Sequence, residues 1–140
     1  MTERVLIDTG PMVALFSADD EHYRRCTDAL TGLTSPLFTC WPVVTEAAWL
    51  LRKRPNSLHQ LFESFDGGLF ALLTLDAGDL PAIAALMKRY ESSGLQFADA
   101  ALAHLAEREG IRTVFTLDRR DFSILRLKRN RTLRLIPDIP

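Results

Sequence analysis

Acidic residues stand directly after two apolar segments of this 140-residue chain. Asp8 follows the apolar run at residues 5–7, and Asp118 follows a β-branched and apolar run at residues 113–117. Both runs are typical of buried strands, and in open α/β sheets ligands bind outside the carboxyl ends of the parallel strands. The sequence therefore predicts that Asp8 and Asp118 share one edge of a sheet, although they are far apart in the chain.

Two further acids belong to predicted helices. Glu46 lies inside an apolar helix expected at residues 42–54, so we expect it to be half-buried and to need a partner or a metal ion. Asp99 lies in the first turn of a helix expected at residues 97–109, where an acid also favours the helix dipole. Each acid taken alone has an equally good structural explanation. Their joint placement favours a functional site.

Carboxylates that converge on one pocket repel one another, which makes each of them harder to ionise. A divalent cation relieves that repulsion, and ligands that are all oxygen atoms suit Mg²⁺ or Mn²⁺. Such an ion can activate a water molecule toward a phosphodiester and stabilise the charge on the leaving oxygen. The acids therefore predict metal-dependent phosphodiester hydrolysis, with one ion or two.

Short strand-like runs alternate with helical patterns along the chain. Parallel neighbours need crossover connections, so this alternation predicts an α/β domain with a mostly parallel sheet and helices on both faces. We find no repeat or linker and expect one domain over residues 1–140. Strands are expected at residues 4–7, 37–40, 69–75, 113–117 and 133–136, and helices at 11–18, 21–30, 42–54, 58–65, 79–90 and 97–109.

The composition is that of a soluble globular protein, with 47% hydrophobic and 25% charged residues. No segment approaches the roughly 20 apolar residues that span a bilayer, and the first apolar run is too short for a signal peptide. Cys26 and Cys40 lack any metal-ligand or disulfide pattern and are interpreted as free thiols. We therefore expect a cytoplasmic protein with no membrane association.

Basic residues crowd the last quarter of the chain, although the formal net charge is only −1. Such a concentration is compatible with a phosphate-binding surface, and a merely solvated charged face is the alternative. Arg119 and Arg120, beside Asp118, are predicted to contact backbone phosphates. The full set is Arg108, Arg112, Arg119, Arg120, Arg126, Lys128, Arg129, Arg131 and Arg134.

Four segments together resemble the motifs of PIN-domain proteins, and specifically those of VapC-type toxins from toxin–antitoxin pairs. Each segment alone is a weak signal, but the four in this order and spacing are specific and cover nearly the whole chain. The main departure is Gly10-Pro11, where many relatives carry an apolar or small residue. The segments are Leu6-Ile7-Asp8-Thr9, Thr45-Glu46-Ala47, Phe97-Ala98-Asp99-Ala100 and Thr116-Leu117-Asp118-Arg119-Arg120-Asp121-Phe122.

The resemblance implies a three-layer fold with four or five mostly parallel strands, and a Mg²⁺-dependent endoribonuclease in which Mn²⁺ is a possible substitute. It implies that a VapB-like antitoxin covers the site and that the chain forms homodimers. It also implies roles for individual residues. Asp8, Glu46, Asp99 and Asp118 would be metal ligands, with Asp8 and Asp99 the strongest candidates, Asp121 would be an accessory catalytic acid, and Thr9 and Thr116 would orient waters or carboxylates.

Other functions remain open on the sequence alone. A phosphatase of the haloacid-dehalogenase type needs a second acid where this chain has Gly10, and a response-regulator receiver lacks its phospho-acceptor and lysine here. A PIN-like RNA-processing nuclease that is not a toxin, or a catalytically silent module that binds RNA or protein, fits the same fold. Because every acid of the motif set is still acidic, the sequence favours the enzyme.

Overall fold

A computed structural model describes residues 3–138 of the chain. The single domain expected over residues 1–140 stays a prediction. The elements alternate as the sequence predicts. In chain order they are β1 (Val5–Ile7), α1 (Thr9–Ala14), α2 (Tyr23–Thr31), β2 (Leu37–Thr39), α3 (Trp41–Leu50), α4 (Pro55–Asp66), β3 (Phe70–Leu72), α5 (Leu80–Arg89), α6 (Phe97–Glu109), β4 (Thr113–Phe115), α7 (Arg119–Ser123) and β5 (Arg134–Ile136), with 3-10 turns at Ala77–Asp79, Glu91–Ser93 and Lys128–Asn130.

The five strands form one parallel sheet in the order β3-β2-β1-β4-β5. β1 is the central strand, with Leu6 opposite Phe38 of β2 on one side and opposite Val114 of β4 on the other. The chain first winds outward from β1 to β3 and then crosses to β4 and β5 on the other side. The strand order therefore reverses at β1, and such a reversal opens a crevice at the carboxyl edge of the sheet.

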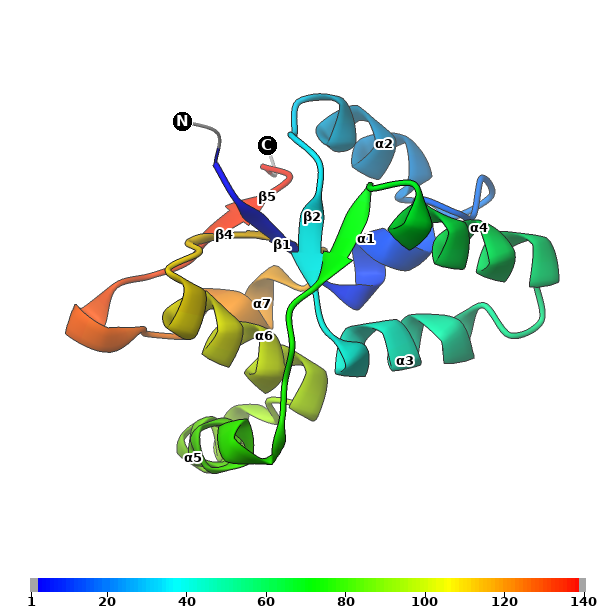
Figure 1. Cartoon of the computed structure of the whole chain (residues 1–140). Coiled ribbons are helices and arrows are strands. Elements are labelled where there is room, and N and C mark those ends of the chain that lie inside the picture. Colours follow the sequence, from blue (N-terminus) through cyan, green and yellow to red (C-terminus); the bar gives the residue numbers. More distant parts are fainter. Residues whose placement is uncertain (1–2, 139–140) are drawn as a thin grey trace.

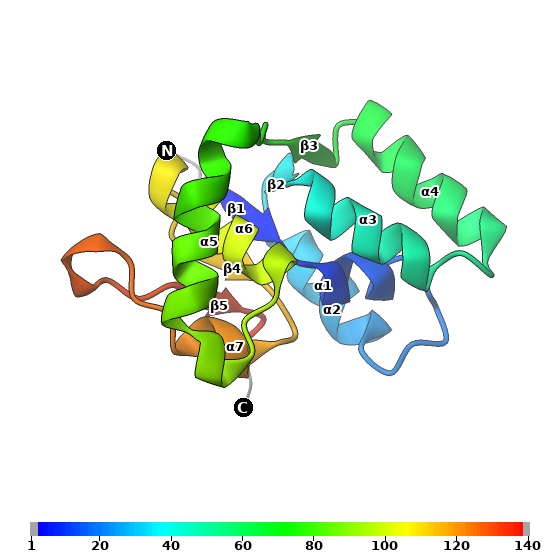
Figure 2. The ribbon, with the colours of Figure 1, turned by 90° about the horizontal axis from the view of Figure 1, so that it is seen from below.

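Helices cover both sides of this sheet, as predicted. Right-handed crossovers place α1–α4, which belong to the outward winding, on the opposite face from α5–α7, which belong to the return. Figures 1 and 2 show this division: α1–α4 gather on one side of the molecule, and α5–α7 gather on the other, with β1 between them. The predicted α/β fold with a parallel sheet and two helical layers is thus confirmed.

The structure corrects several predicted element boundaries. The segment after β4 is not a simple turn, because α7 occupies residues that were expected to be loop. The strand expected at residues 69–75 is shorter in the structure, where β3 covers only Phe70–Leu72. The helix expected to begin at Pro11 begins at Thr9, two residues earlier. None of the helices among residues 3–138 is both long and apolar enough to cross a bilayer.

Helix α6 is the best buried helix and fixes the position of Asp99. Eight of its residues are buried, from Ala98 through Ala106, because α6 lies against both α5 and α3. Its small alanine side chains permit this close packing on more than one face. The helix ends at Gly110, whose φ of +68° is a left-handed conformation that glycine adopts without steric cost.

Candidate metal centre

Asp8 and Asp118 lie at the carboxyl edge of the sheet, on adjacent strands, and Thr116 links them. The Thr116 hydroxyl donates to Asp8 Oδ2 at 2.9 Å and accepts a hydrogen bond from the Asp118 backbone N–H at 2.9 Å. The Asp8 N–H also donates to the Phe115 carbonyl at 2.9 Å, which extends the pairing of β1 with β4. Asp118 then caps α7, since its Oδ1 accepts from the Asp121 N–H at 3.3 Å.

Helices α6 and α7 bring two more acids to this edge. One carboxylate oxygen from each of Asp99, Asp118 and Asp121 can be chosen so that all three lie within 4.8 Å of one another. All five predicted acids line one cavity of about 440 Å³ between α1, α3, α6 and α7. Its remaining lining residues are Thr9, Gly10, Leu50, Gln96 and Leu117.

Three acids of this cavity, Asp8, Asp99 and Asp121, have raised pKa values. Burial, reinforced by repulsion from Asp8, Asp118 and Asp121, raises the pKa of Asp99 to about 7. Burial also raises the pKa of Asp8 to about 6, against the lowering effect of hydrogen bonds from Thr9 and Thr116. Burial and the neighbouring Asp118 raise the pKa of Asp121 as well. The site therefore carries more negative charge than its own groups can compensate.

Glu46 lines the cavity but is not half-buried as expected. Its side chain is exposed, and so are Trp49 and Leu50, which are 62% and 52% exposed. The prediction failed because it assumed that apolar neighbours one turn away are buried, whereas α3 presents them to solvent. Glu46 can therefore turn toward the cavity or toward solvent.

The donor set fits a hard divalent cation. Every charged group that lines the cavity is a carboxylate, and Mg²⁺ and Mn²⁺ favour such oxygen ligands. Among the described residues, the Thr9 hydroxyl oxygen is buried without a hydrogen-bond partner. Because a buried polar atom without a partner is costly, the Thr9 hydroxyl is suited to bind a water molecule inside this cavity. The repulsion, the oxygen donors and the unpaired hydroxyl all favour a hydrated cation.

The two arginines beside Asp118 have different environments. Arg119 Nη1 donates to the carbonyls of Leu135 and Pro137, at 3.2 Å and 2.9 Å, and this contact ties α7 to β5. Arg120 is exposed, and its positive charge partly offsets the rise in the pKa of Asp121. Phosphate contact stays a prediction for both residues, and Arg120 is the better placed of the two.

Sequence reasoning missed two residues that shape the cavity. Gln96 precedes α6 at its N-cap position and lines the cavity beside Asp99; a polar residue just before the predicted helix start was the signal that could have found it. Gly10 passes close to Leu117, because a Cβ on Gly10 would lie 3.3 Å from Leu117 Cβ. The departure at Gly10 thus fits the tight approach of α1 to the segment after β4.

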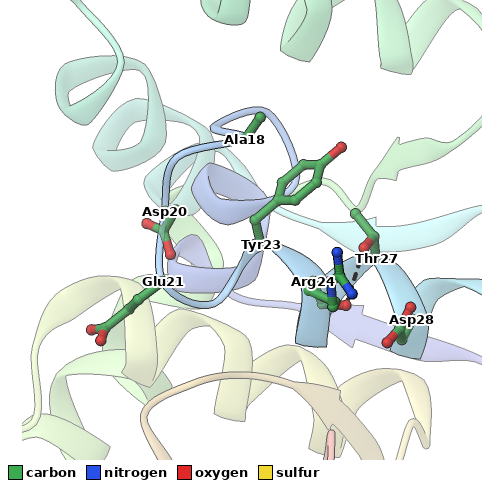
Figure 3. Close-up of a pocket in the computed structure, with 7 residues that line it drawn as sticks. All are labelled: Ala18, Asp20, Glu21, Tyr23, Arg24, Thr27 and Asp28. Carbon is green, nitrogen blue, oxygen red and sulfur yellow. Dashed lines mark hydrogen bonds between the residues drawn. The ribbon is translucent and has the colours of Figure 1, made fainter.

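A larger cavity, of about 550 Å³, lies elsewhere, at the start of α2. Figure 3 shows that its acids diverge: Asp20 and Glu21 lie on one side of Arg24, and Asp28 lies on the other. Among residues 3–138, the only group of at least three acidic, histidine or cysteine side chains close enough to share an ion is Asp99, Asp118 and Asp121. The 440 Å³ cavity is therefore the candidate metal centre.

Replacing Thr116 with valine is expected to weaken Mn²⁺ binding by about 10- to 100-fold, the usual effect of removing a residue that orients metal ligands. Valine keeps the shape of threonine but neither donates to Asp8 nor accepts from the Asp118 N–H. Calorimetric titration with Mn²⁺ measures the change. Thr116→Ser should restore most of the affinity, and wild-type affinity in Thr116→Val would contradict the positioning role.

Comparison with known proteins agrees with the fold. The sequence matches the PIN domain family over residues 5–128. Ribonuclease VapC26 of Mycobacterium tuberculosis is 30% identical over 124 residues, which are 87% of this chain and 92% of that protein. The crystal structure of VapC20, a sarcin-ricin loop cleaving toxin of the same organism, superposes with a TM-score of 0.76 at 16% identity, covering 84% of this chain and 92% of that one.

A toxin–antitoxin complex from Klebsiella pneumoniae superposes with a TM-score of 0.68 at 17% identity, covering 86% of this chain and 92% of that one. At such low identities the two superpositions support the fold alone. The sequence matches to the PIN domain family and to VapC26 cover most of the chain, so they support assignment to a family. This chain belongs to the PIN domain family, as a VapC-like member.

Proposed function

We propose that this chain is a Mg²⁺-dependent endoribonuclease and the toxin component of a toxin–antitoxin pair. The observation that carries the proposal is the convergence of Asp8, Asp99, Asp118 and Asp121 on one cavity, where their mutual repulsion calls for a cation. The relative VapC26, which is named a ribonuclease, supports RNA as the substrate.

Asp8, Glu46, Asp99 and Asp118 would hold the ion, directly or through water, with Asp121 as an accessory acid. When bound, Mg²⁺ supplies a Lewis acid for the phosphoryl oxygen and lowers the pKa of a coordinated water; Mn²⁺ can substitute. Hydrolysis breaks the phosphorus–oxygen bond to the leaving group as the water oxygen bonds to phosphorus.

The remaining residues of the cavity position this chemistry. Thr116 fixes the orientation of the Asp8 carboxylate, and the unpaired Thr9 hydroxyl can bind a water molecule. Arg120, exposed beside the acids, is suited to a substrate phosphate. Leu50 and Leu117 add apolar surface to the lining of the cavity.

The partner of this toxin would be a VapB-like antitoxin that covers the acidic cavity and keeps the enzyme inactive. The VapC-like assignment supports such a partner, and the Klebsiella protein of the same fold is found in a toxin–antitoxin complex. We also propose a homodimer and a cytoplasmic location; the two cysteines, both buried free thiols, are compatible with a reducing compartment.

The test is cleavage of total RNA by the purified protein, stripped of any antitoxin. We expect fragments in Mg²⁺, no fragments in EDTA, and recovery when Mn²⁺ is added. Cleavage that persists in EDTA would contradict the metal mechanism. A folded protein that binds RNA but cuts none in Mg²⁺ or Mn²⁺ would favour the silent binding module instead.

A further inference from the structure

The structure separates the basic residues of the last quarter into paired and unpaired ones. Arg134 pairs with Glu3 at 2.9 Å, and Arg108 pairs with Asp79 and Glu109 at 3.2 Å and 2.9 Å. Within residues 3–138, none of the cations at positions 126, 128, 129 and 131 forms an ion pair with an acid. Arg112, Arg119 and Arg120 also form no ion pair among these residues, but the segment between α7 and β5 holds four such cations close together in sequence: Arg126, Lys128, Arg129 and Arg131.

Part of this segment borders a groove of about 530 Å³ between α5 and α6. Arg126 and Lys128 line the groove together with Arg89 at the end of α5, and Arg108, which is paired with Asp79 and Glu109, is the fourth cation there. Glu107 is the one acid that lines it, while Leu86 and Leu127 give it an apolar surface. A groove with cations and apolar patches has the chemistry to hold a nucleic-acid strand, with phosphates on the cations and ribose or base faces on the apolar patches.

Residues 128–131, here called the basic turn, have an unusual backbone. Arg129 and Asn130 both have positive φ angles, of 64° and 59°, and the Leu127 N–H closes the turn on the Arg131 carbonyl at 2.8 Å. Glycine adopts this conformation without steric cost and arginine does not. In both views the basic turn, coloured orange, projects from the body of the molecule (Figures 1 and 2). An arginine at a position that favours glycine indicates that its side chain has a use.

The groove lies within reach of an RNA strand whose phosphate is in the acidic cavity. Asp99 lines that cavity and Glu107 lines the groove, and both belong to α6. The separation of their positions along the chain corresponds to about 12 Å along a helix at 1.5 Å per residue. Helix α7 also connects the sites, since Asp121 lines the cavity and Arg126 follows the helix into the groove.

We propose that the α5–α6 groove and the basic turn form a second RNA-binding site, which holds backbone phosphates of the substrate away from the bond that is cut. This site rests on the proposed function for its substrate. It binds the RNA backbone through charge and is insensitive to the catalytic acids. Lys128 and Arg129, both exposed, carry the binding, and Arg126, whose Nη1 also donates to the carbonyls of Ser123 and Leu125, adds positive charge beside them.

The test compares two variants that each remove two exposed positive charges: Lys128→Gln/Arg129→Asn in the basic turn and Arg24→Gln/Arg25→Gln on α2. Asparagine tolerates the left-handed backbone at position 129 better than most residues. A fluorescent random-sequence RNA of about 30 nucleotides is titrated in EDTA over a range of KCl. Because two cations no longer contact phosphates, the basic-turn variant should bind about tenfold more weakly at low salt. The plot of log K against log[KCl] should become less steep, with the magnitude of its negative slope smaller by about 1.4.

The α2 variant should bind this RNA as the wild-type protein does. Equal binding by both variants and the wild type, or no measurable RNA binding by the wild type, would overturn the second site. Cleavage in Mg²⁺ is measured separately, on the long RNA and on four-nucleotide fragments. If no protein cuts either RNA but the basic-turn variant alone loses binding, the proposed nuclease function fails while the second site stands.

Discussion

Replacing Asp99 with asparagine is expected to slow RNA cleavage by about 10²- to 10³-fold while the protein stays folded. Asparagine has nearly the same shape as aspartate, but it is neutral and a poorer ligand for Mg²⁺. Asp99 is the buried member of the three-acid cluster and lines the same cavity as Asp8, so its replacement removes a carboxylate from that cavity. The single-turnover rate at saturating Mg²⁺ measures the effect.

A matched control makes this experiment specific. Asp28→Asn changes an exposed acid on α2 by the same substitution, and it lies in the other cavity shown in Figure 3. This variant should cleave at the wild-type rate. Circular dichroism and thermal unfolding must show that both variants are folded. If the Asp99→Asn protein is folded and still cleaves RNA at the wild-type rate, the acidic cavity is not the catalytic site.

Without metal, the protein is expected to lose about 6 kcal/mol of unfolding free energy as the pH rises from 4 to 8. The pKa of Asp8 rises from an ordinary 3.8 to about 6 on folding, and that of Asp99 to about 7. In this pH window the folded state therefore binds more protons than the unfolded state. The stability that these two groups contribute is complete below the ordinary pKa of 3.8 and is lost as the pH passes through 6 and 7.

Asp79 affects the unfolding free energy at lower pH than Asp8 and Asp99, so it does not obscure the decline expected between pH 4 and 8. Hydrogen bonds from the Asp76 backbone and from His104 and Arg108 lower its pKa to about 2, so its contribution to stability is lost only as the pH falls toward that value. Urea unfolding in EDTA at pH 5, 6, 7 and 8 measures the predicted decline.

Two additions test its cause. Mg²⁺ favours the ionised carboxylates, so the stabilisation by 10 mM Mg²⁺ should increase with pH. Asp99→Asn should be more stable than the wild type at pH 8 in EDTA and should show a shallower decline. If the wild type and Asp99→Asn have the same pH dependence in EDTA, the acidic cavity is not the source of the decline.

The sequence alone predicted the fold class and the place of the acids. Apolar runs at β1 and β4 and helical patterns between them are local signals, and the parallel sheet follows from their alternation. Asp8 and Asp118 follow strands that proved adjacent, because the carboxyl ends of parallel strands meet at one edge. Asp8 and Asp118 could therefore be expected together from strand patterns alone, whereas Asp121 was placed in the site only by the family resemblance.

The segment after β4 could not be predicted from local patterns. Helix α7 has only five residues, four of them polar or charged, so it carries too little helical periodicity to predict. Its formation depends on the Asp118 cap and on Phe122, which is fully buried against the rest of the core. The approach of Asp121 to Asp99 is a consequence of this tertiary packing.

Exposure and charge pairing were likewise decided by the tertiary structure. Glu46 has apolar neighbours on its helix, yet that face of α3 is exposed, because which side of a helix meets the core depends on how the helix packs. The basic residues of the last quarter look alike in the sequence, but folding brings Glu3 to Arg134 and Asp79 to Arg108 and leaves the basic turn unpaired. Sequence patterns determine which residues can do chemistry, and long-range packing determines which of those charges remain free to do it.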